Sequence, residues 1–423
     1  MQRPILTGVV LLALWTALVG LGARNGWLRP EPAPAGDAAA FLRWASSQYA
    51  RDSKGNIAIV LLEDGRPAQS FFASHGRPVD ERTQFQVASL SKWLTAWGVM
   101  ALVEDGRIEL DAPVSRYLTR WSLPPGRYDN SGVTVRRLLA HTSGLTDGLG
   151  FQGFAPGEAV PSLEQELTHV TDAMPSADGV VRVGAKPGSG WRYSGGGYLI
   201  LQLMIEDVTG EAFDAYMRRT VFAPLGMGDS TFEAPDPGKL ADFFAADGSP
   251  ATHYRFAATG AASLYTSAAD LTAFLQAQSP GPGGAPAGRG VLAPETLREM
   301  ATPQAKLFGL PVWGLGESLY APTTSGGFVV GHDGQNHPAI NTTARIDPAT
   351  GDGIIVLATG SSTLARAIGG EWTFWQTGKV ALDSLVLFDA AYILAVFAAG
   401  VVIIVGSVAA VMLAQRRRAR RPC

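Results

Sequence analysis

The chain has 423 residues, with 34 basic and 37 acidic side chains and a net charge of −3, so its charge gives no reason to expect nucleic-acid binding. Hydrophobic residues make up 46% of the chain, enough for one large domain or two, and 50 glycines and 27 prolines indicate many turns rather than disorder. The one cysteine, Cys423, is the last residue. A disulfide framework, a thiolate metal site and a cysteine nucleophile are therefore excluded from the main domain.

The first segment, residues 1–25, is predicted to be a signal anchor or a signal peptide. Its uncharged run from Ile5 to Ala23 follows Arg3 and is long enough for either. Residues 26–38, rich in proline and alanine, are expected to form a linker that spaces the next domain from the membrane.

The last segment predicts a membrane helix. Residues 385–414 contain an uncharged run from Ala390 to Ala414, and the basic tail 415–423 carries five arginines. The positive-inside rule places this tail and the N-terminus in the cytoplasm. We therefore expect the intervening domain to lie outside the cytoplasm, on the periplasmic or cell-surface side of the cell membrane.

Residues 39–379 are predicted to form the main domain, which opens with a helix and a hairpin. Residues 39–50 have helical spacing of apolar side chains, whereas 57–62 and 69–73 have strand texture and are separated by Asp64-Gly65.

The next stretch, Phe85 to Gly106, is apolar almost all round and predicts a buried helix that ends near Gly106. Its first turn contains Ser89 and Lys92, which lie on one face because residues three apart on a helix are neighbours. A desolvated lysine with a lowered pKa can take the proton of a serine hydroxyl and make it a nucleophile. Ser89 could instead be a helix cap, so the choice between these two roles depends on motifs elsewhere in the chain.

The rest of the domain predicts a helical insertion followed by strands. Residues 111–250 are broken by proline and glycine and contain short helices, and residues 268–277 form a further predicted helix. Strand texture then returns around 327–331 and at 342–346 and 353–359, followed by a helix at 363–375. The predicted fold class is α/β (α+β): one antiparallel sheet assembled from both ends of the domain and flanked by helices, with a mainly helical subdomain at about 111–250.

Two later positions could complete a site for acyl transfer. Tyr193 precedes Ser194-Gly195-Gly196-Gly197, and its phenol would lose its proton more easily beside a lysine ammonium. His332 follows a strand-like run, and Gly334 would leave room for a substrate along that strand. Tyr193 could instead be a core aromatic beside a flexible turn, and His332 could be a solvent-facing histidine at a strand end.

Together these motifs resemble the serine β-lactamase and penicillin-binding-protein superfamily. The resemblance rests on Ser89-x-x-Lys92, Tyr193-Ser194-Gly195 and His332-x-Gly334 in that order, and it covers roughly residues 39–375. Secondary matches are Gly106 to Val114, His141 to Leu145, Pro224 to Met227 and Ser267 to Leu271. The most similar branch contains class C β-lactamases, D-Ala-D-Ala carboxypeptidases and related esterases.

The resemblance implies an α/β sandwich with a helical subdomain and assigns roles to the motif residues. Ser89 would be the acylated nucleophile, Lys92 its base partner and Tyr193 the general acid and base. His332 stands where many members carry a lysine, and the oxyanion would be held by the backbone N–H groups of Ser89 and Gln335, just after Gly334. His141 resembles a structural feature of the family.

The expected function is a membrane-anchored serine hydrolase that acts on an ester or amide through an acyl-Ser89 intermediate. Gly195 replaces a substrate-binding asparagine of the penicillin-recognising members, and His332 with Asp333 would make the carboxylate pocket less positive. These departures favour an esterase or peptidase over a β-lactamase. The alternatives are a D-Ala-D-Ala carboxypeptidase or β-lactamase, and a catalytically degenerate binding or scaffold protein.

No cofactor or metal is expected, because His75, His169, His253 and His337 lack the spacing of metal ligands. The expected partner is a small-molecule or peptide substrate.

Overall fold

The computed structural model describes residues 2–27, 29–147, 150–175, 177–337 and 339–419. Its centre is an antiparallel eight-stranded sheet with the order β2-β1-β12-β11-β10-β9-β8-β7. The strands are β1 (Ile57–Glu63), β2 (Arg66–Ala73), β7 (Ala305–Leu307), β8 (Leu310–Trp313), β9 (Ser318–Pro322), β10 (Phe328–Asn336), β11 (Ile340–Ile346) and β12 (Gly353–Ala358). The two ends of the domain sequence thus meet in one sheet, as predicted.

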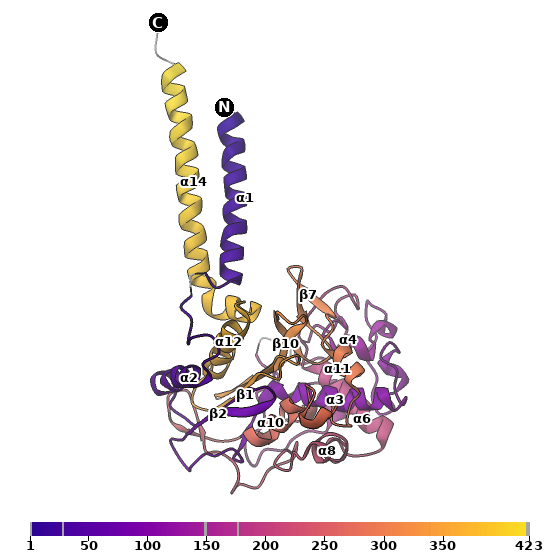
Figure 1. Cartoon of the computed structure of the whole chain (residues 1–423). Coiled ribbons are helices and arrows are strands. Elements are labelled where there is room, and N and C mark those ends of the chain that lie inside the picture. The colour runs from indigo at the N-terminus through magenta and orange to yellow at the C-terminus, as the bar shows by residue number, and fades with distance from the viewer. Residues whose placement is uncertain (1, 28, 148–149, 176, 338, 420–423) are drawn as a thin grey trace.

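Helices cover both faces of this sheet and form the insertion between its two halves (Figure 1). The α-helices are α1 (Gln2–Arg24), α2 (Ala38–Asp52), α3 (Ser91–Glu104), α4 (Val135–Leu139), α5 (Leu163–Thr168), α6 (Gly196–Thr209), α7 (Phe213–Met217), α8 (Ala223–Leu225), α9 (Thr259–Ala262), α10 (Ala268–Gln276), α11 (Pro294–Met300), α12 (Leu364–Thr377), α13 (Leu382–Ser384) and α14 (Ala390–Ala419). Short 3₁₀ and π turns are η1 (Ala88–Leu90), η2 (Val114–Arg116), η3 (Asn130–Gly132), η4 (Arg218–Phe222), η5 (Pro282–Gly284) and η6 (Leu385–Asp389). Two-stranded pairs join β3 (Gln84–Gln86) to β6 (Tyr265–Ser267), and β4 (Phe243–Phe244) to β5 (Pro250–Ala251).

The two faces of the sheet belong to two separate cores, because successive side chains of a strand point to opposite faces. On β1, Ile57, Ile59 and Leu61 pack with residues of α2 and α12. The intervening side chains of β1 pack with α3 and α10 on the other face. The predicted fold class, an antiparallel sheet flanked by helices with a helical insertion, is confirmed.

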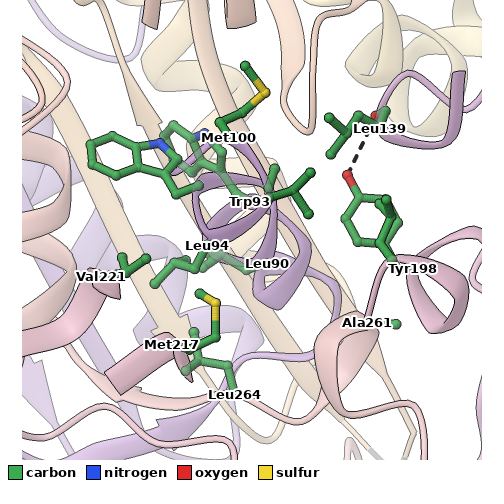
Figure 2. Packing of buried hydrophobic residues seen from close by; sticks show 14 of the residues in the cluster. Leu90, Trp93, Leu94, Met100, Leu139, Tyr198, Met217, Val221, Ala261 and Leu264 are labelled. Atoms are coloured by element: carbon green, nitrogen blue, oxygen red, sulfur yellow. Dashed lines mark hydrogen bonds between the residues drawn. The ribbon is translucent and has the colours of Figure 1, made fainter. Parts of the chain in front are cut away.

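Helix α3 lies in the middle of the larger core (Figure 2). Twelve of its residues, from Ser91 to Leu102, are buried, which agrees with the apolar sequence on all sides. Trp93 and Trp97 pack against Phe274 of α10, with ring centroids 4.9 and 5.0 Å apart. Helix α3 is therefore a rigid support for whatever stands at its N-terminus.

The helix itself begins later than the sequence predicted. Residues 84–86 form β3, and Ser89 lies in the 3₁₀ turn η1 before α3 begins at Ser91. Ala88 has a φ of +47°, an unusual conformation for a residue with a Cβ. This turn holds Ser89 half-exposed at the end of a buried helix, while Lys92 is already inside the core.

The terminal helices α1 and α14 run side by side away from the domain (Figure 1). Both are long and apolar enough to cross a membrane, over Arg3–Arg24 and Ala390–Arg417. Trp15 donates a hydrogen bond to the carbonyl of Phe397 at 3.0 Å. The predicted basic tail 415–423 is described only as far as residue 419, because 420–423 lie outside the described residues.

Glu317 gives a test of how the core is built. Its carboxyl group is buried and accepts a hydrogen bond from Trp93 Nε1 at 2.8 Å, and burial raises the pKa of Glu317 from 4.5 to about 8. The carboxyl is therefore protonated in the folded protein at neutral pH but ionised in the unfolded chain. The contribution of this protonated carboxyl to the free energy of unfolding is complete below about pH 4.5 and is lost as the pH rises towards 8.

We expect Glu317→Gln to keep the bond to Trp93 without this pH dependence. Relative to wild type, the variant should gain up to about 4 kcal/mol in free energy of unfolding between pH 5 and pH 8. Urea unfolding of the full chain in detergent, followed by tryptophan fluorescence, measures the difference. A difference that stays constant across this range would show that Glu317 is ionised in the folded state.

Candidate active site

Ser89 and Lys92 are in direct contact, as their spacing predicted. Lys92 Nζ lies 3.1 Å from Ser89 Oγ and donates a second hydrogen bond, 2.8 Å long, to the carbonyl of Ala261 on α9. Lys92 is 1% exposed. The amine is thus buried and held by two oxygen atoms, one from a side chain and one from the backbone.

Burial lowers the pKa of Lys92 from 10.5 to about 7, while the charge of Asp147 acts in the opposite direction. Removing an ammonium from water disfavours its charged form, so a large part of Lys92 is a neutral amine at neutral pH. A neutral amine has a free lone pair and can accept the proton of Ser89. This pair has the chemistry that activates a serine nucleophile.

Tyr193 lies on the other side of the amine. Lys92 Nζ is 5.1 Å from the centre of the Tyr193 ring, and the phenol also hydrogen-bonds with Ser89. His141 stacks on Tyr193 at a centroid distance of 4.3 Å, and its Nδ1 accepts a 3.2 Å hydrogen bond from the backbone N–H of Ser194. His141 therefore orients the Tyr193 segment from a buried position, in keeping with the structural role expected for it.

The expected ionisation of Tyr193 is wrong. Burial raises the pKa of Tyr193 above its ordinary value and outweighs the hydrogen bond with Ser89. The ammonium form of Lys92 was expected to favour a phenolate, but with a pKa of about 7 this form is only partly populated at neutral pH. The resting site therefore contains a protonated phenol, able to donate a proton before it accepts one.

Strand β10 forms the opposite wall. Strand β9 pairs with β10 only as far as Gly331, whereas β11 pairs with it through Asn336, so residues 332–336 have an edge that β9 does not cover. A Cβ on Gly334 would lie 1.9 Å from the carbonyl oxygen of Val87. Only glycine allows β10 to approach the turn that carries Ser89, and this approach brings Ser89 and Gln335 to the same cavity.

His332 is buried rather than facing solvent. Its Nδ1 lies 2.6 Å from the carbonyl oxygen of Asp333, so Nδ1 carries the hydrogen and Nε2 is left as an acceptor. Burial, reinforced by the charge of Lys92, lowers the pKa of His332 to about 4. His332 is therefore a neutral hydrogen-bonding group, at the position where the resemblance described above implies a lysine in many members.

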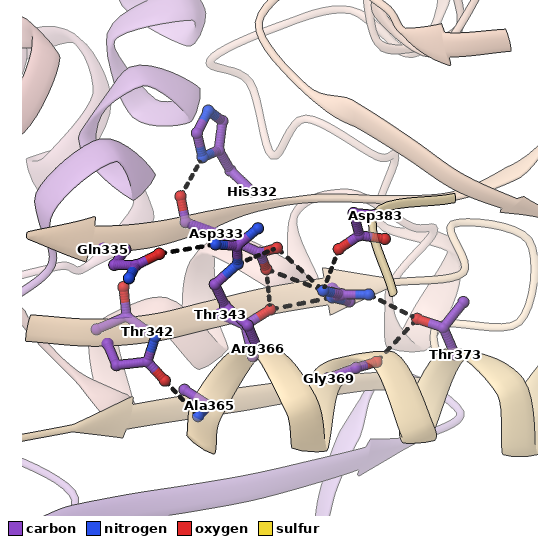
Figure 3. Close-up of polar contacts among 12 residues, drawn as sticks. His332, Asp333, Gln335, Thr342, Thr343, Ala365, Arg366, Gly369, Thr373 and Asp383 are labelled. Atoms are coloured by element: carbon purple, nitrogen blue, oxygen red, sulfur yellow. Dashed lines mark hydrogen bonds and ion pairs between the residues drawn. The ribbon is translucent and has the colours of Figure 1, made fainter. Parts of the chain in front are cut away.

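Asp333 does not act on the pocket as the sequence suggested. Arg345 donates to both carboxylate oxygens of Asp333 at 3.1 Å, and Arg366 Nε lies 3.6 Å from one of them (Figure 3). Burial opposes ionisation of Asp333, but the two guanidinium groups outweigh it and hold the pKa of Asp333 below its ordinary value. The added carboxylate is thus neutralised by its arginine partners, so the predicted contribution of Asp333 to a less positive pocket is wrong. The contribution predicted for His332 agrees with its neutral state.

Arg366, on α12, was missed by sequence reasoning. Its Nη1 donates a 2.7 Å hydrogen bond to Oε1 of Gln335, and its side chain lines the cavity that contains Ser89. No motif marks Arg366, since it lies in an amphipathic helix 34 positions after His332 and arrives only through packing of α12 on the sheet.

Ser89, Tyr193 and Gln335 are shared by two cavities. One, of about 370 Å³, extends past Lys92 towards Phe151 and Met174 in the helical insertion. The other, of about 310 Å³, extends past His332 towards Trp191, Trp313, Tyr320, Arg366 and Asp383. A substrate carbonyl at Ser89 therefore has room on both sides, as a bond between an acyl group and a leaving group requires. All six predicted site residues, Ser89, Lys92, Tyr193, His332, Gly334 and Gln335, are gathered in this region.

Comparison with known proteins agrees with this geometry. The Beta-lactamase family model matches residues 45–373. Esterase EstB of Burkholderia gladioli is 31% identical over 276 residues, which cover 57% of this chain and 67% of the esterase. The D-alanyl-D-alanine-carboxypeptidase/endopeptidase AmpH of Escherichia coli K12 is 26% identical over 289 residues, 65% of this chain and 69% of AmpH.

Solved structures agree on the fold. A beta-lactamase/D-alanine carboxypeptidase from Pseudomonas syringae superposes with a TM-score of 0.62 at 17% identity, covering 79% of this chain and 97% of that one. The family match spans most of the chain, and the named relatives are hydrolases. The chain therefore belongs to the beta-lactamase family and is a serine hydrolase of that family.

Proposed function

We propose that the protein is a membrane-anchored, extracytoplasmic esterase or amidase that works through an acyl-Ser89 intermediate. The observation that carries this proposal is the 3.1 Å contact between Ser89 Oγ and the buried amine of Lys92, whose pKa is about 7. A serine paired with a neutral amine in a cavity open on both sides is poised for nucleophilic attack.

In the acylation step, Lys92 takes the proton of Ser89 as Oγ bonds to the substrate carbonyl carbon. The backbone N–H groups of Ser89 and Gln335 receive the oxyanion. Donors that are already in position can stabilise such a charge strongly. Tyr193 gives its phenolic proton to the leaving oxygen or nitrogen, and the carbonyl–leaving-group bond breaks. The proton held by Lys92 then restores the phenol.

Deacylation uses the same groups with water. Lys92, neutral again, takes a proton from the attacking water, and the bond between the acyl carbon and Ser89 Oγ breaks to release a carboxylic acid. Ser89 receives the phenolic proton of Tyr193, and the proton held by Lys92 then restores the phenol. The raised pKa of Tyr193 keeps the phenol protonated at neutral pH, so a proton is available for the leaving group in the first step. His332, neutral and with an unpartnered Nε2 among the described residues, is suited to accept a hydrogen bond from the substrate.

Membrane anchoring by both terminal helices is supported by the contacts of α1. Arg24 donates to the carbonyl of Val380, Lys379 Nζ donates to Asn25, and Arg29 pairs with Glu371. A cleaved signal peptide would not need this fit to the end of the folded domain, so we favour a retained anchor. The basic end of α14 then lies in the cytoplasm and the catalytic domain outside it.

A second candidate is a D-Ala-D-Ala carboxypeptidase, favoured by Arg366 in the cavity. A guanidinium group beside Gln335 can pair with the terminal carboxylate of such a peptide. Against it stands the neutral His332, where the penicillin-recognising relatives are expected to carry a lysine. An ester substrate needs no such carboxylate, and esterase EstB is among the relatives.

The role of Ser89 is tested by removing its oxygen. We expect Ser89→Ala to lower ester hydrolysis by at least about 10³-fold, because no other group can form the acyl intermediate. A fluorophosphonate probe should label the wild-type protein and not the variant. Undiminished labelling of Ser89→Ala would refute the assignment.

The role of Lys92 is tested by the pH profile. Below pH 7 the ammonium cannot accept the proton of Ser89, so kcat/KM for a neutral ester should rise through about pH 7 and then level off. Lys92→Arg, which remains charged, should lose both activity and this rise. A wild-type profile that is flat from pH 5 to pH 9 would count against Lys92 as the base.

The choice between the two candidates depends on Arg366. If the substrate is a peptide acid, Arg366→Gln should lower kcat/KM for a D-Ala-D-Ala peptide about 10- to 100-fold, through the lost charged hydrogen bond. The C-terminal amide of the same peptide is the matched control and should be little affected. If a neutral ester remains the better substrate of wild type and variant alike, the esterase proposal stands.

A further inference from the structure

The cavity beside Ser89 continues into a second, apolar groove. This groove, of about 270 Å³, shares Trp191, Trp313, Ser318, Tyr320 and Asp383 with the Ser89 cavity. These shared residues line both spaces, so the groove and the Ser89 cavity are adjacent. A chain-like group bound at Ser89 would reach the groove by passing between these side chains.

The far end of the groove is formed by two segments on the membrane side of the domain. Leu307 and Val312 come from the β7–β8 hairpin, whereas Leu382, Val386 and Leu387 come from the segment that leads directly into α14. In Figure 1 this hairpin projects on the same side of the domain as α1 and α14. The groove thus lies between the Ser89 cavity and the base of the predicted membrane helices.

The apolar side chains around this opening are unusually exposed. Phe308, at the tip of the hairpin, is 84% exposed, and Val386 and Leu387 are 57% and 50% exposed. Phe308 also has a φ of +51°, a conformation that disfavours a side chain of its size. Exposed large apolar groups are costly in water but favourable at a bilayer surface, where their area is removed from water.

The lining indicates a hydrocarbon occupant. Apart from the residues shared with the Ser89 cavity, the side chains that line the groove are aliphatic: Leu307, Val312, Leu319, Leu382, Val386 and Leu387. A peptide in this space would leave its N–H and C=O groups without side-chain partners, whereas an acyl chain has no such groups to satisfy. Continuity with the membrane helices gives an acyl chain a direct route from the bilayer.

We propose that Ser89 acts on a membrane-resident amphiphile whose acyl chain enters through this groove, which we call the membrane-facing groove. The proposal rests on the serine hydrolase function and the membrane anchoring proposed above. Ser89 Oγ bonds to the acyl carbon and the bond to the head alcohol or amine breaks, with a proton passing to that leaving group. Water then releases the fatty acid and restores Ser89.

The test uses the full chain in phosphatidylcholine nanodiscs and two esters with one leaving group. The ratio of initial rates on 4-methylumbelliferyl palmitate and 4-methylumbelliferyl acetate is measured for wild type and for the double variant Phe308→Asp, Val386→Asp. Aspartate accepts the backbone conformation of residue 308 better than phenylalanine, and neither position lines the cavity that contains Ser89. Ala223→Asp, on the exposed helix α8 away from the membrane helices, adds one negative charge far from the groove and is the control for surface charge.

We expect the palmitate-to-acetate ratio to fall about tenfold or more in the double variant and to remain at the wild-type value in Ala223→Asp. An unchanged ratio would overturn the proposal, as would an equal loss on both esters, which indicates general damage. An unchanged ratio together with dissociation of a dimer would assign the exposed residues to self-association instead. Acetate hydrolysis that persists in Ser89→Ala would reject the proposed function itself, independently of the groove.

Discussion

The burial of one amine governs the site. Lys92 is surrounded by the packing of α3, α6 and α9, and the loss of water there lowers its pKa to about 7. The core around α3 is therefore part of the chemistry: the same tight packing that stabilises the fold makes Lys92 a base. Its two oxygen partners, Ser89 Oγ and the carbonyl of Ala261, fix the direction in which the amine acts. Tyr193, His141 and β10 are arranged around this fixed point.

A second constraint, the buried guanidinium of Arg345, joins the site to the segment that leads into α14. Arg345 contacts Asp333 on β10 and Asp383 on α13, and it lies 3.6 Å over the ring of Tyr320. Removing one partner would leave a buried charge without compensation, so the cluster holds these elements together. Asp383 also borders both the Ser89 cavity and the membrane-facing groove. The segment that leads to α14 therefore also lines the cavity that contains Ser89.

Local patterns in the sequence predicted the helices and strands, whereas the ionisation states of the site residues depend on long-range packing. The apolar run of β1 before Asp64-Gly65 was sufficient to predict the hairpin, and the nearly all-round apolar sequence of α3 the central helix. The order of the elements predicted that both ends of the domain meet in one sheet. The contact of Ser89 with Lys92 followed from their separation by three residues. The neutral state of His332, the protonated phenol of Tyr193 and the pairing of Asp333 with Arg345 depend on burial and on neighbours from other strands and helices. No local signal marks Arg366, whose position depends on how α12 packs against β11 and β12.

The account depends most directly on the charge of Lys92 in the resting protein. The ¹³Cε chemical shift of this lysine, assigned by comparison with Lys92→Arg in the full chain, reports its protonation as the pH is raised. The structure predicts a single inflection near pH 7, because the buried ammonium loses its proton there. A shift that stays constant until about pH 10, the ordinary range of a lysine in water, would contradict the central claim.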